Sequence, residues 1–91
     1  MESVEAKAFL KHKALERGNF YACFMVEVAS VTIDIVQLKR SHNYLGWWII
    51  RRNLIRMVVR VCLSHGWDPD TIKRDLQRFL NLAAKPYEQL P

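Results

Sequence analysis

Hydrophobic residues in the middle of the chain recur at steps of three and four, the period that places them on one face of an α-helix. In residues 19–40 the positions that follow this period are Phe20, Phe24, Val28, Val31, Ile35 and Leu38. The many β-branched residues also suit a strand, but alternation at period two fails around Ala29, and Glu27 and Asp34 fall on a separate polar stripe. The pattern predicts a largely buried helix capped by Asn19.

Residues 44–65 predict a second long helix, about 33 Å in length. On a helical projection its polar residues form one narrow stripe, made of Arg52, Asn53, Arg56, Arg60 and Ser64. The rest of the circumference is almost wholly apolar. A helix of this kind is typical of the centre of a bundle or of an interface.

A shorter helix is predicted over residues 3–17, where Ser3 is a suitable N-cap and Gly18 a suitable terminator. Its apolar stripe is thin, so we expect it to pack at an edge.

A fourth helix is predicted over residues 69–84. Gly66 ends the helix before it, and Asp68-Pro69-Asp70 supplies an N-cap, a first-turn proline and an acidic first turn. Trp67 is placed to fold back on the preceding helix, and Pro86 is expected to stop the fourth one.

These elements predict an all-α fold, a small bundle of three to four helices forming a single domain over residues 1–86, with a loosely held tail over 87–91. The two long helices are expected to form the core. A chain of 91 residues buries only about 60–65% of its unfolded surface, yet 51% of its residues are hydrophobic. The apolar surplus predicts a homodimer, with the two long helices as its seam.

The net charge of +5 is concentrated in the second half of the chain. Residues 1–43 carry six basic and five acidic side chains, whereas residues 44–85 carry eight basic and three acidic ones. Such an excess favours an acidic partner, namely nucleic acid, an anionic membrane surface or an acidic protein face.

The arginine stripe is the main candidate binding site. Arg52, Arg56 and Arg60 are spaced by four residues and form a ridge about 12 Å long, and arginine can hold phosphate oxygens through two hydrogen bonds. The residues of the following helix expected to widen this patch are Lys73, Arg74 and Arg78. Two other interpretations remain: a solvated face that keeps the helix soluble, and an acidic protein partner.

Three residues of the same helix are predicted to lie at an interface. Adjacent Trp47 and Trp48 point about 100° apart, so the two side chains cannot face the same neighbour. One interpretation is that both are core residues packed against different helices. The other is that one of them is exposed, where it suits an interface or base stacking. Arg51 falls within the apolar arc and requires an acidic partner there. There are three alternatives for Arg51. It can pair with Glu27 or Asp34 of the same chain, it can pair with a carboxylate across a dimer interface, or its side chain can reach solvent.

No pattern in the sequence predicts a catalytic site, a metal site or a cofactor. The three histidines are scattered, there is no glycine-rich phosphate loop, and pairing Cys23 with His42 as a nucleophile and base has no local support. Cys23 and Cys62 lie in apolar stretches and are expected to be small buried residues of a cytoplasmic or nuclear, reducing environment. Charged residues interrupt every apolar stretch, so no membrane-spanning helix is expected.

The function predicted first is therefore a small basic nucleic-acid-binding protein, without enzyme activity, that reads a duplex RNA or DNA by shape and charge. The alternative is a protein interaction module or small regulator whose tryptophan-containing helix receives a partner protein.

Overall fold

The computed structural model describes residues 4–88 of the chain, and the side chains of residues 4–84. This part of the chain contains four α-helices and no strand. The helices are α1 (Val4–Arg17), α2 (Asn19–Arg40), α3 (Tyr44–His65) and α4 (Pro69–Glu88). The all-α prediction is confirmed, and the predicted bounds of the two long helices match those observed.

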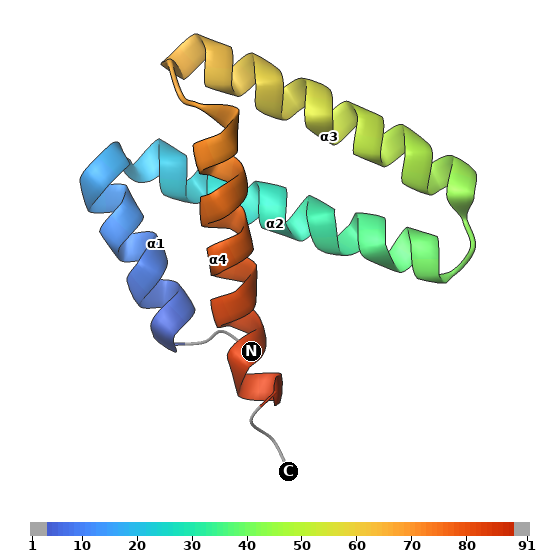
Figure 1. The fold of residues 1–91 in the computed structure, drawn as a ribbon, viewed down its shortest axis with the longest axis horizontal. Helices are drawn as coiled ribbons and strands as arrows, with labels where there is room; N and C mark the ends of the chain where they lie inside the picture. The colour runs from blue at the N-terminus through green and yellow to red at the C-terminus, as the bar shows by residue number, and fades with distance from the viewer. Residues whose placement is uncertain (1–3, 89–91) are drawn as a thin grey trace.

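The two long helices form an antiparallel hairpin, and the other two helices cover one end of it (Figure 1). α4 crosses the first half of α2, and α1 lies beside α4. The far end of the hairpin, where α2 ends and α3 begins, projects beyond them. The molecule is accordingly flat, with extents of 43 × 38 × 17 Å.

The hydrophobic core lies where the four helices meet. It is built from Tyr21, Phe24, Met25 and Val28 of α2 with Cys62 of α3 and Ile72 of α4. The sequence placed both long helices at the centre. For α3 this prediction is confirmed in part. Cys62 is its one fully buried residue among 22, and Leu54, Met57, Val58 and Val61 pack half-buried against the core cluster. Dimerisation remains a prediction.

The helix ends follow the local signals except at the start of α2 and at the end of α4. The Asn43 side chain caps α3 by accepting a hydrogen bond from the backbone of Gly46, and Gly66 ends α3 in the left-handed conformation. Asp68 accepts hydrogen bonds from the Asp70 backbone and the Thr71 hydroxyl, as an N-cap does.

At the start of α2, the predicted N-cap was wrong. Asn19 was the predicted cap, but it is the first helical residue, and Gly18 occupies the cap position with no side-chain hydrogen bond. The reason lies in the sharp turn between α1 and α2. Gly18 has φ of 101° and ψ of 159°, a conformation that essentially only glycine adopts.

The end of α4 also differs from the prediction. The helix continues through Pro86 to Glu88, since a proline in the last turn removes one backbone hydrogen bond where few remain to be broken. The first two residues of the predicted tail, 87 and 88, are therefore helical, and residues 89–91 and the predicted cap Ser3 lie outside the described residues.

One described helix, α2, is long and apolar enough to cross a membrane by length and composition. The core helix of a soluble protein meets the same criteria, and α2 supplies four of the six residues of the core cluster. Packing in the core explains part of its apolar character, since 33% of its most apolar window is buried. The expectation that no helix would meet these criteria is corrected, because the two charged residues that interrupt the apolar run, Glu27 and Asp34, leave it apolar enough.

Candidate functional site

The predicted arginine ridge lies along α3, and its three members differ in exposure. Arg56 and Arg60 are exposed, whereas Arg52 is half-buried. The Arg52 guanidinium carbon lies 4.8 Å from the centroid of the Trp48 ring, and its Nε is buried without a hydrogen-bond partner. The outer two arginines are thus open to a ligand, while the first leans against an aromatic face.

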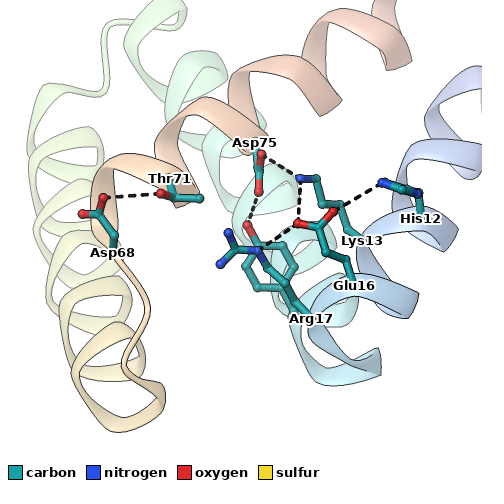
Figure 2. A network of polar contacts seen from close by, with 8 residues as sticks. His12, Lys13, Glu16, Arg17, Asp68, Thr71 and Asp75 are labelled. Carbon is teal, nitrogen blue, oxygen red and sulfur yellow. Dashed lines mark hydrogen bonds and ion pairs between the residues drawn. The ribbon is translucent and has the colours of Figure 1, made fainter.

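Ion pairs in the described side chains gather around α1 and do not include the ridge arginines (Figure 2). Glu16 lies 3.3 Å from His12, 3.6 Å from Lys13 and 3.5 Å from Arg17. Lys13 Nζ also lies 3.4 Å from an Asp75 carboxylate oxygen on α4. The basic residues in this part of α1 are therefore matched by carboxylates.

None of the six predicted nucleic-acid-binding residues forms an ion pair with another side chain in residues 4–84. α3 contains four arginines and no acidic residue. The positive charge of α3 is consequently left without any compensation on its own helix.

At its inner end the α1 network reaches a buried tyrosine of α2, through Asp75 of α4. The Tyr21 hydroxyl donates a hydrogen bond to Asp75, and Tyr21 is 0% exposed. Burial, together with the hydrogen bond and the charge of Asp75, raises the pKa of Tyr21 well above its usual range. This contact could not be predicted from local sequence patterns, because its partners lie 54 residues apart.

The three predicted binding residues of α4, Lys73, Arg74 and Arg78, are exposed. Lys73 and Arg74, with Asp70 and Gln77, line an open hollow of about 560 Å³. Lys73 also lines a second hollow that it shares with α3. Arg78 lies one helical turn beyond Arg74. Of the three, Lys73 is the residue that lines a hollow together with α3.

The hollow between α3 and α4 is an apolar groove of about 340 Å³. Its apolar lining comes from three helices and consists of Val28, Leu54, Ile55, Val58, Val59, Pro69, Ile72 and Leu76. Lys73 and Asp70 are the charged residues at its edge.

Large apolar side chains remain exposed along α3, and two of them, Ile55 and Val59, also line this groove. Five of them recur at helical spacing and form what we call the α3 strip: Leu45, Trp48, Ile55, Val59 and Leu63. Leu45 is 71% exposed and Leu63 80%. Arg52 belongs to the same face of the helix, so the strip and the arginine ridge share a border.

The two adjacent tryptophans point in different directions, as their position on a helix requires. Trp47 is half-buried against the end of α2, with Lys39 Nζ 5.3 Å from its ring centroid. Trp48 is 51% exposed. Of the two, Trp48 is therefore the one available to a partner.

Arg51 departs from the prediction of an ion pair within the chain. It is exposed, as are Glu27 and Asp34, and no ion pair joins it to either among the described residues. Its guanidinium carbon lies 5.8 Å from the Trp47 ring centroid instead. The reason is the projection of the hairpin beyond α1 and α4, which leaves this part of α3 in solvent. A pair across an interface remains a prediction.

The cysteines and histidines do not assemble a reactive site in the described part of the chain. Cys62 is buried, which raises its thiol pKa, but Cys23 is exposed, contrary to expectation. Cys23 and His42 lie near opposite ends of α2, roughly 28 Å apart along the helix. In residues 4–88, no group of three or more His, Cys, Asp or Glu residues is placed to hold a metal ion.

An aromatic cluster joins the start of α2 to the end of α3. Of its members, only the packing of Trp67 was predicted from the sequence. The His65 ring lies 4.8 Å from that of Phe20 and 4.5 Å from that of Trp67. Trp67 also meets the edge of Tyr21 at 5.0 Å. The expectation that Trp67 folds back is confirmed, and His65 takes a packing role.

No family model, curated protein or solved structure matches this chain.

Proposed function

We propose that the protein binds nucleic acid, without enzyme activity, by contacting the phosphate backbone of an RNA or DNA duplex through the arginines of α3. The observation that carries the proposal is the uncompensated charge of this helix. It has four arginines and no acidic residue, and Arg56 and Arg60 are exposed without an ion pair in residues 4–84.

The geometry of the ridge suits a polyanion. Arginines four residues apart on a helix are about 6 Å apart along its axis, so the ridge presents successive cations to a line of phosphates. Each phosphate contact releases counterions, which makes binding favourable and dependent on salt. Contacts of this kind position a protein on a duplex without reading its sequence.

The basic residues of α4 play a supporting part in this proposal. Lys73 stands across the apolar groove from Ile55 and Val59, so a duplex lying along α3 has one further cation within reach. Arg74 and Arg78 add to the long-range attraction, which depends on net charge more than on contact.

We infer also that the protein acts as a homodimer. Of the large apolar side chains on α3, seven are exposed: Tyr44, Leu45, Trp48, Ile50, Ile55, Val59 and Leu63. A monomer gains nothing from leaving so much apolar surface in water. Association of two copies is the commonest way in which proteins cover such a surface.

A second candidate function, a protein interaction module, is favoured by the apolar groove between α3 and α4. A groove of this kind accepts the apolar face of a partner helix. Binding of that type depends on buried apolar area, so it survives high salt, whereas binding to phosphates does not.

The variant Arg56→Glu tests the proposed function. We expect its affinity for a fluorescent duplex of about 16 base pairs to fall at least about tenfold, to a similar extent for different sequences. The slope of log affinity against log salt should become shallower by about 1. Fluorescence anisotropy at several salt concentrations measures both quantities.

The matched control is Lys11→Glu, which makes the same change of net charge at an exposed position of α1. We expect it to reduce the affinity by less than about threefold, since only long-range attraction changes. Equal losses in the two variants would show that net charge, and not the α3 ridge, holds the duplex.

A further inference from the structure

The α3 strip has the pattern of a surface that matches a second copy of itself. The residues of this face are arranged in pairs around Leu54. Leu45 precedes it by nine residues and Leu63 follows it by nine, while Arg52 precedes it by two and Arg56 follows it by two. Trp48 precedes Leu54 by six residues and Val59 follows it by five. Along the helix axis, the strip is therefore nearly symmetric about the position of Leu54.

This symmetry is what an antiparallel pair of α3 helices around a two-fold axis requires. With the axis at the level of Leu54, Leu45 faces Leu63 of the second copy, and Trp48 faces Val59. The leucine contacts form at the two ends of the paired helices, about 13 Å from the axis, and the contacts between Trp48 and Val59 lie closer to it, at about 8 Å.

The five side chains of the strip are between 44% and 80% exposed. A specific interface requires a total of about 1,000 Å², so each of two facing strips has to contribute about 500 Å². Apolar patches on monomers reach roughly 300–600 Å², a range that includes this value.

The centre of the same pair is electrostatically unfavourable. Arg52 of one copy faces Arg56 of the other on both sides of the axis, and α3 has no acidic residue to separate them. Repulsion between these four arginines opposes the association that the apolar ends favour. A line of phosphates laid across the seam neutralises the arginines of both copies at once.

We propose that α3 pairs with α3 of a second copy, and that the phosphate-binding site is completed at this seam by arginines of both chains. The inference rests on the proposed function, because the polyanion is what relieves the repulsion. Nucleic acid and the second copy then strengthen each other's binding, as linkage between two binding equilibria demands.

Salt has opposite effects on the two equilibria. Without nucleic acid, higher salt screens the arginines, so we expect the dissociation constant of the dimer to fall by roughly tenfold between 50 and 500 mM salt. Binding of the duplex weakens over the same range. Sedimentation velocity of the full chain measures the first effect, and a dimer that weakens as salt rises would contradict the proposal.

Two double variants, each at two highly exposed apolar residues, test whether dimerisation depends on the strip or on exposed apolar surface in general. Leu45→Gln with Leu63→Gln removes the apolar ends of the seam and leaves every arginine in place. The control is Val4→Gln with Leu15→Gln on α1, where the side chains are 83% and 82% exposed. Circular dichroism checks that both proteins keep their helices.

We expect the strip variant to be monomeric at both salt concentrations and to bind the duplex at least tenfold more weakly, whereas the control behaves as the unsubstituted protein does. If the strip variant dimerises like the control, the proposal is wrong. It is also wrong if the unsubstituted protein stays monomeric under all conditions, in which case the strip would be left to a helix of another protein.

The variant Arg56→Glu distinguishes failure of the seam from failure of the proposed function. The introduced carboxylate faces Arg52 of the second copy, so the dimer without nucleic acid should become at least tenfold tighter at low salt while duplex binding is lost. Loss of duplex binding with no change in dimerisation overturns the seam alone. Tighter dimerisation in a protein that never binds a duplex overturns the proposed function alone.

Discussion

Tyr21 shows how a single residue joins elements that are distant in sequence. Its ring is fully buried, with Trp67 at its edge and the Arg17 guanidinium 5.2 Å from its centroid. Its hydroxyl donates to Asp75 on α4, which also pairs with Lys13 on α1. Three helices are therefore held together around one phenol.

We expect Tyr21→Phe to lower the free energy of unfolding by about 1.5–3 kcal/mol, the usual contribution of a hydrogen bond to a charged group. The control Tyr44→Phe removes an exposed hydroxyl that contacts His42 and should change stability by less than about 0.5 kcal/mol. Urea unfolding followed by circular dichroism measures both. Similar effects in the two variants would mean that the buried contact adds no stability.

The raised pKa of Tyr21 also predicts how stability depends on pH. The native state favours the neutral phenol, so the unfolded chain loses this proton first, and stability should fall as pH rises above about 10. In Tyr21→Phe this part of the decline should be absent. The raised pKa of Cys62 gives a decline that begins lower, above about pH 8.5, and is common to both proteins.

At the scale of single elements, the sequence predicted α2 and α3 residue by residue, because strong local signals surround them. Asn43 and Gly66 fix the two ends of α3. The neighbours of α3 could not be predicted in the same way. Its apolar circumference indicated a central or interfacial helix, and only the packing of α1 and α4 against α2 shows that a single chain leaves much of it uncovered.

The site was predictable to a similar extent. The four-residue spacing of Arg52, Arg56 and Arg60 follows from the helix alone, whereas the position of Arg74 and Arg78 relative to that ridge depends on how α4 crosses the hairpin. The exposure of Arg51 depends on the same crossing.

The glycines at two helix ends give a prediction at this scale. Gly18 has a conformation open essentially to glycine alone, so Gly18→Ala should cost about 1–3 kcal/mol. Gly66 is left-handed, with φ of 68°, where alanine costs about 1–2 kcal/mol. Neither added Cβ meets another atom within 4 Å, so the loss of stability in each variant comes from backbone strain and not from a steric clash. Urea unfolding should rank Gly18→Ala as the more destabilised, and the reverse order would contradict this view.

The whole molecule is a flat arrangement in which charge and apolar surface share one helix. Its core is small, and the projecting hairpin carries arginines beside exposed leucines and a tryptophan. A solvated face would explain the arginines but not the apolar strip, and a protein-binding groove would explain the strip but not the lack of any acidic residue on α3. Two copies that share a duplex account for both.

The proposed binding of a phosphate backbone by the α3 arginines requires that the protein form a complex with a short duplex. Light scattering of the purified protein, with and without such a duplex, measures the mass of this complex. The account predicts a complex containing two protein chains at low salt, and its dissociation as salt rises beyond the physiological range of about 150 mM. A mass that the duplex leaves unchanged at every salt concentration would contradict it.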